Sequence, residues 1–206
     1  MKGCASDFIQ LNYKDLSTIA YIVIEKRVQL SLVDSSIGGL DEKQERTLAK
    51  VYYSNEDNYI FIVFSELVQS DRCYAVASLL FNNIESSNYI ILDELDTFSY
   101  VSKTPEHRNI APLLRKLSTI NDSTICPSLE PPNIIDGLPA ALLSFGVYYE
   151  KQVDVYLSLV HKYNTTADTL KAFEEIFPEK KYVDDKEYID LIANHMKTQS
   201  NNPLYT

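Results

Sequence analysis

Histidines are the first side chains in this sequence that could do chemistry, because the imidazole ring is a common metal ligand and acid–base group. A protein metal site needs several ligands that lie close together. The three histidines are far apart in the chain, and none has a second ligand type at metal-site spacing: His107, His161 and His195. We therefore expect no metal site, and we predict surface or strand-end positions for all three.

Carboxylates are the second kind of side chain that could do chemistry. Asp93, Glu94 and Asp96 lie close together in the stretch LDELDTF. Paired carboxylates can act as a general acid and a general base. No base, metal-ligand cluster or phosphate-binding loop accompanies them in the sequence. We favour a solvated acidic turn near a strand end, with an acid–base site as the alternative.

The candidate nucleophiles and the candidate phosphate loop lack the neighbours that such sites require. Cys126, in STICPSL, has no activating residue nearby in sequence, so we predict a structural thiol. Ser144, in LLSFG, lacks the glycine two residues earlier that a nucleophile elbow carries. The SSIGGL stretch at residues 35–40 lacks both the Lys-Ser/Thr pair of a P-loop and the third glycine of a dinucleotide fingerprint. These absences favour a protein that is not an enzyme and binds no cofactor.

Composition narrows the class of partner. The 206 residues carry a formal net charge of -10, which argues against nucleic-acid binding and favours basic partner surfaces. Three scattered cysteines indicate a reducing compartment. The N-terminal MKGCASDFIQ lacks the apolar core of a signal peptide, and no apolar run approaches the roughly 20 residues of a membrane span. We expect a cytoplasmic protein without membrane insertion, and leave open an association with the nucleus or the endoplasmic reticulum.

Hydrophobic patterns predict strands that alternate with helices. Strands are expected at residues 19–24, 28–33, 58–64, 88–95, 97–101 and 153–160. Helices are expected at residues 70–84, 138–151, 166–177 and 185–197. The first two strands should form a hairpin, the strand at 58–64 should be covered on both faces, and Ser70 or Asp71 should cap the first helix. Residues 41–50 read as a short exposed helix or loop, and residues 104–133 as mostly loop with an amphipathic turn at PLLRKL.

This order of elements predicts an α/β fold, with a central mixed β-sheet flanked by helices in one layered domain. We place that domain at residues 1–197 and a flexible tail at residues 198–206.

Residues 124–145, TICPSLEPPNIIDGLPAALLSF, read physically as an extended loop that leads into a helix. Several of its residues resemble a stretch of the proteasome assembly chaperone 1 family, in which Cys-Pro-x-Leu-Glu-x-Pro-Asn-Ile runs into Leu-Pro-Ala-Ala. The matching positions here are Cys126, Pro127, Leu129, Glu130, Pro132, Asn133, Ile134, Leu138, Pro139, Ala140 and Ala141. The resemblance leaves open whether these residues are structural or contact a partner.

The last three residues, Leu204, Tyr205 and Thr206, fit the hydrophobic–tyrosine–any (HbYX) motif of proteasome-binding proteins. The resemblance implies a non-catalytic chaperone that pairs with proteasome assembly chaperone 2 on the α-subunit ring of the 20S core particle. It implies that the heterodimer promotes ring formation and prevents ring dimerisation, with the tail docked in a pocket between α subunits. The alternative is a small α/β enzyme or ligand-binding domain of nucleoside-phosphorylase-like type, which a deep pocket with converging polar groups would favour.

Overall fold

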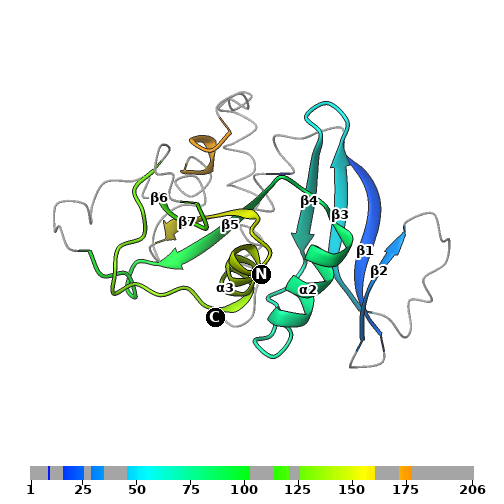
Figure 1. Ribbon diagram of the computed structural model, residues 1–206, viewed down its shortest axis with the longest axis horizontal. Helices are drawn as coiled ribbons and strands as arrows, with labels where there is room; N and C mark the ends of the chain where they lie inside the picture. The colour runs from blue at the N-terminus through cyan, green and yellow to red at the C-terminus, as the bar shows by residue number, and fades with distance from the viewer. Residues whose placement is uncertain are drawn as a thin grey trace, which may run out of the picture.

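A computed structural model describes residue 9 and residues 16–25, 29–34, 46–102, 114–120, 126–160 and 172–177. Within these residues, two small β-sheets lie on either side of helices α2 and α3, which gives a mixed α/β architecture (Figure 1). The predicted α/β class is therefore confirmed. No helix in the described part of the chain is long and apolar enough to cross a membrane.

The first sheet has four antiparallel strands in the order β2-β1-β3-β4. Its strands are β1 (Ser17–Glu25), β2 (Gln29–Asp34), β3 (Arg46–Ser54) and β4 (Tyr59–Phe64). Strands β1 and β2 pair from Ala20 opposite Asp34 to Glu25 opposite Gln29, which confirms the predicted hairpin.

Two predictions for this sheet were wrong. Residues 46–50 begin strand β3 instead of forming a helix or loop, because the buried Leu48 and Ala49 face the core while the strand pairs with both β1 and β4. Strand β4 is not covered on both faces, since Tyr59 and Ile60 are 37% and 43% exposed. An edge position in an antiparallel sheet explains this exposure.

The second sheet is mixed; the sequence predicted one central mixed sheet, whereas the described strands form two separate sheets. The second sheet contains β5 (Asn88–Asp96), β6 (Leu114–Ser118) and β7 (Gln152–Val160) in the order β5-β7-β6. Strand β7 runs parallel to β5 and antiparallel to β6. Because it is the middle strand, β7 is buried along nearly its whole length.

The structure also corrects the sequence interpretation around this sheet. Residues 97–101 are a turn and not a strand, because Asp96 accepts hydrogen bonds from the backbone N–H groups of Phe98 and Ser99. Residues 114–118, expected within a loop and an amphipathic turn, form strand β6. Its charged side chains Arg115 and Lys116 are buried and paired, which a sequence pattern cannot show.

Helix α2 (Cys73–Asn83) and helix α3 (Gly137–Tyr148) form where the sequence predicted helices. The expected cap of α2 by Ser70 or Asp71 was wrong: the N-cap is Arg72, with no side-chain hydrogen bond at that cap. Helix α3 starts at Gly137, whose φ of 64° favours glycine, and Pro139 lies in its first turn.

The two helices connect the sheets. One hydrophobic cluster joins buried residues of the first sheet, such as Ile22 and Val51, to Val76 of α2 and Phe145 of α3. Helix α3 also packs closely on β7, where a Cβ at Gly146 would lie 2.9 Å from Val153 Cβ. Helices α2 and α3 thus lie between the two sheets, as Figure 1 shows.

The remaining predicted elements lie largely outside the described residues. Of the helix expected at residues 166–177, residues 172–174 are helical and Phe173 is fully buried. The helix expected at 185–197 and the tail at 198–206 lie outside the described part of the chain, so the predicted division at residue 197 stays a prediction.

Candidate functional site

The stretch that resembles the chaperone family lies along the outer edge of strand β6. The backbone N–H of Lys116 donates to the carbonyl of Pro127 at 3.0 Å, and the N–H of Leu129 donates to the carbonyl of Lys116 at 2.8 Å. Lys116 and Ser128 thereby form a parallel β-bridge. The stretch covers an edge that would otherwise present unpaired backbone groups to other chains.

Glu130 fixes this segment to the sheet through a network of charged and polar groups. The Tyr100 hydroxyl donates to Glu130 Oε1 at 2.5 Å, and Arg115 Nε donates to the same hydroxyl at 2.9 Å. Arg115 Nε also lies 3.4 Å from Glu130 Oε2, and the guanidinium sits 5.3 Å from the centre of the Tyr100 ring. Burial raises the pKa of Glu130, but the Tyr100 hydrogen bond, a backbone hydrogen bond and Arg115 outweigh it, so the pKa is lowered overall.

Asn133 holds the next part of the segment. Its Oδ1 accepts from the backbone N–H of Val101 at 2.7 Å, while its Nδ2 donates to the carbonyls of Val101 at 2.9 Å and Glu130 at 2.7 Å. These three bonds tie the loop that follows β5 to the loop that precedes α3. An asparagine has both the donor and the acceptor that this pairing requires.

The other residues of the resemblance divide between core and surface. Cys126 and Leu129 are buried, whereas Pro127 and Pro132 are exposed, and Leu138 and Pro139 lie half-buried in the first turn of α3. Burial raises the pKa of Cys126 to about 11, with Lys116 acting in the opposite direction. A thiol with this pKa is almost wholly protonated at neutral pH, which fits the structural role that the sequence suggested.

A second buried network, on the opposite side of β6, was missed by the sequence analysis. Lys116 Nζ lies 3.2 Å from Asp154 Oδ1, and the two side chains are 5% and 4% exposed. Ser118 donates to Asp154 Oδ1 at 2.5 Å, Gln152 donates to Oδ2 at 3.1 Å, and Lys116 lies over the Tyr156 ring. The one available signal was the aspartate inside the mostly apolar run VDVYLSLV.

Burial lowers the pKa of Lys116, but the hydrogen bond to Asp154 and the charges of Tyr156 and Asp154 raise it, and the net shift is upward. The Lys116 ammonium therefore stays charged at neutral pH. Its pair with Asp154 joins β6 to β7 and leaves neither charge available as a reactive base.

The candidate catalytic residues are not brought together among the described residues. Asp93 and Glu94 lie within β5, and not in the acidic turn that we favoured; Asp96 ends the strand and starts the turn. Burial, with smaller contributions from Glu94 and Asp136, raises the pKa of Asp93. Ser144 Oγ donates to the carbonyl of Ala140 inside α3.

Several residues that the sequence singled out as candidate sites lie outside the part of the chain that the structure describes. His107, His161 and His195, the SSIGGL stretch and the tail residues Leu204, Tyr205 and Thr206 lie outside the described residues. Among the residues that the structure does describe, no cluster of three or more His, Cys, Asp or Glu side chains could hold a metal ion.

Solved structures share this fold. A Pyrococcus furiosus protein described as PbaA, an archaeal homolog of proteasome-assembly chaperone, superposes with a TM-score of 0.59 at 12% identity, over 96% of this chain and 82% of its own. Pyrococcus furiosus PbaB, described as an archaeal proteasome activator, gives 0.56 at 14% identity, over 95% and 84% of the two chains. A Thermoplasma acidophilum protein of unknown function gives 0.60 at 12% identity, over 96% and 80%. The chain thus shares its fold with these three archaeal proteins.

Comparison of the amino-acid sequence with known families shows which family the chain belongs to. The family model PAC1, described as Proteasome assembly chaperone 4, matches residues 39–206, and the chain belongs to this family. Proteasome assembly chaperone 1 of Homo sapiens is 40% identical over 68 residues, which cover 32% of this chain and 24% of the relative. The Xenopus laevis chaperone of the same name is 33% identical over 101 residues, covering 43% and 34%. These alignments thus span a quarter to a third of the curated relatives, and the family resemblance of the sequence is confirmed.

Proposed function

We propose that this protein is a non-catalytic chaperone of 20S proteasome assembly that acts as a heterodimer with proteasome assembly chaperone 2 on the ring of α subunits. In this role it promotes ring formation and prevents off-pathway ring dimerisation. The observation that carries the proposal is the family match over residues 39–206. The names of the Homo sapiens and Xenopus laevis relatives support the same role.

The family stretch has a structural part in this proposal. Pro127–Leu129 covers the β6 edge, and Glu130 and Asn133 fix the loop that leads into α3. A covered edge cannot pair with a strand of another chain. The residues of this stretch would then shape the domain that carries the tail, instead of contacting the α ring themselves.

The tail supplies the proposed contact with the α ring. Leu204 would fill an apolar part of a pocket between α subunits, and Tyr205 would add a large rigid surface with a polar tip. If Thr206 is the true C-terminus, its carboxylate would meet a lysine in that pocket. Residues 197–206 reach at most about 35 Å when extended, so the tail and the body of the heterodimer would bind the same ring together.

Co-purification tests this proposal. The tagged chain is expressed with chaperone 2 in cells of its source, either intact or without residues 204–206, and the retained proteins are identified by mass spectrometry. The intact chain should retain chaperone 2 and α subunits, and the shortened chain should retain chaperone 2 with fewer α subunits. The proposal is wrong if the intact chain retains no α subunits, and the tail's role is wrong if the deletion changes nothing.

A further inference from the structure

Helices α2 and α3 contain no charged residue, although 23% of the chain is charged. Their sequences are CYAVASLLFNN and GLPAALLSFGVY. A helix on the surface of a soluble protein normally carries charged residues on its outer side. Depletion of charge combined with exposed aromatic residues is the composition found at the centre of protein–protein interfaces.

Large apolar side chains of these helices are exposed. Tyr74 of α2 is 71% exposed, and Val147, Tyr148 and Tyr149 at the end of α3 are 65%, 80% and 43% exposed. We call Tyr74, Tyr148 and Tyr149 the aromatic face. Its exposed tyrosine surface equals about two whole side chains, or roughly 400 Å² at about 200 Å² each. That is about half of what one partner contributes to a standard interface of roughly 800 Å² per side.

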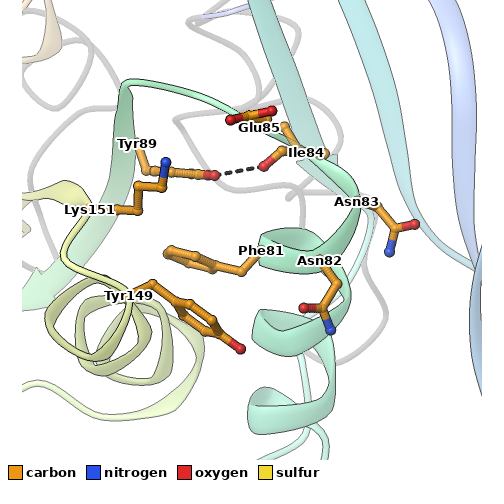
Figure 2. A pocket seen from close by; sticks show the side chains of 8 residues that line it. All are labelled: Phe81, Asn82, Asn83, Ile84, Glu85, Tyr89, Tyr149 and Lys151. Carbon is orange, nitrogen blue, oxygen red and sulfur yellow. Dashed lines mark hydrogen bonds between the residues drawn. The ribbon is translucent and has the colours of Figure 1, made fainter.

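Ring contacts beneath the surface make the aromatic face continuous. The Tyr74 ring lies 4.8 Å from that of Phe145, the Phe145 ring lies 5.8 Å from that of Tyr149, and the Tyr149 ring lies 5.0 Å from that of Tyr148. Phe81 stacks on Tyr149 at 5.7 Å, beside a hollow of about 370 Å³ at the ends of both helices (Figure 2). The tyrosines are thus supported from below, and little side-chain freedom would be lost when a partner binds.

Charged residues lie around the ends of the helices, and carboxylates predominate. Glu85 and Lys151 line the hollow beside Tyr149, and the exposed Glu150 follows Tyr149 in sequence. At the other end, Asp71 and Asp136 lie close enough to Cys73 to raise the pKa of its thiol, although burial contributes more to that shift. Including Arg72, the described residues place four carboxylates and two cations around the aromatic face, as its rim.

We propose that the aromatic face is where this chain binds its heterodimer partner, a chain that presents an uncharged apolar surface with a basic rim. This inference rests on the proposed function. A second copy of this chain fits the rim poorly, because it would bring two acidic rims together and each copy carries a net charge of -10. The face itself recognises apolar surface, and its rim selects the charge of the partner.

Binding measurements with purified proteins test this inference, with chaperone 2 of the same source as the probe. Tyr148→Arg places a charge on the most exposed side chain of the aromatic face, and Phe98→Arg is the matched control. Phe98 is an equally large side chain, 71% exposed, on the turn after β5. Tyr148→Arg should weaken binding at least about tenfold, as expected for an interface hot spot, and Phe98→Arg should change it little. Unchanged thermal unfolding verifies that both variants are folded.

A second pair of measurements tests the chemistry of the partner. The double variant with Glu85→Gln and Glu150→Gln should bind chaperone 2 more slowly, because attraction to a basic rim is reduced. The same variant would associate more strongly with itself if the face bound a second copy. Light scattering of the intact chain alone should show a monomer over a wide concentration range.

The outcomes separate the two proposals. If the intact chain binds chaperone 2 and Tyr148→Arg binds it equally well, the inference is wrong and the proposed heterodimer stands. If the intact chain does not bind chaperone 2, the proposed heterodimer and this inference both fail. Self-association that Tyr148→Arg abolishes would assign the aromatic face to a second copy and overturn the inference.

Discussion

Replacing Asp154 with asparagine should destabilise the protein, because it leaves the Lys116 ammonium buried without its carboxylate. The two side chains are 5% and 4% exposed, so water cannot replace the lost partner. Breaking a buried ion pair by removing one member costs about 3–5 kcal/mol. The asparagine amide would also meet the Gln152 amide, which now donates to Asp154 Oδ2.

The Tyr156 ring offsets part of this cost, since Lys116 Nζ lies 5.3 Å from its centre. A cation–π contact of this kind contributes about 0.5–2 kcal/mol. We therefore expect Asp154→Asn to reduce the free energy of unfolding by about 3 kcal/mol. For a chain of this size, the melting temperature should fall by roughly 6–12 °C.

Urea unfolding followed by far-ultraviolet circular dichroism measures this change, since the chain has no tryptophan for fluorescence. The exposed Glu56 provides a control, and Glu56→Gln should stay within about 0.5 kcal/mol of the parent chain. The double variant with Lys116→Met and Asp154→Leu removes both charges and should cost less than Asp154→Asn alone. A loss below about 1 kcal/mol in Asp154→Asn, or a double variant as unstable as the sum of its single changes, would refute this reasoning.

Three further predictions concern the family stretch and α3. Glu130→Gln should reduce the free energy of unfolding by about 1.5–3 kcal/mol at pH 7. Because the pKa of Glu130 is lowered in the folded chain, its stabilising contribution is complete above the unfolded pKa near 4.3 and is lost as the pH falls through the folded pKa. The difference in stability between the variant and the parent chain should therefore narrow on acidification. An equal difference at pH 7 and pH 3 in urea unfolding would contradict this. Gly146→Ala should reduce the free energy of unfolding by about 1–3 kcal/mol, because the new methyl group meets Val153. Combining it with Val153→Ala should cost less than the sum of the two single changes. Additive losses of stability would disprove the contact. Alkylation of Cys126 at pH 8, followed by mass spectrometry, should be at least about 100-fold slower in the folded chain than in urea, because burial raises its pKa to about 11; equal rates would show an accessible thiol.

The sequence predicted those elements whose pattern reflects their own burial. The apolar runs of β1 and β7, and the helical spacing in α2, depend only on residues within each element. Strand β6 could not be found in this way, because its adjacent Arg115 and Lys116 look like surface residues. They are buried only because Glu130 and Asp154, from two other segments, neutralise them.

The candidate site shows the same limit. Resemblance to a family located the stretch from Cys126 to Pro139, but its structural task depends on β6, which the pattern did not predict. The exposed tyrosines of α3 were also indistinguishable in sequence from the buried Phe145, since all are aromatic residues within an apolar helix. Which side of such a helix is covered depends on tertiary packing.

The strand order β5-β7-β6 also has a consequence for folding during synthesis. The middle strand of the sheet is the last of the three to leave the ribosome, whereas β1 with β2, and β3 with β4, are neighbours in sequence and can pair early. Until residues 152–160 emerge, β5 and β6 have no β7 to pair with. A nascent chain at this stage can contain the first sheet, together with two strands whose pairing partner has not yet been synthesised. The protein that we propose to guide the assembly of others therefore passes through an interval in its own synthesis when strand edges that later pair with β7 are open to aggregation.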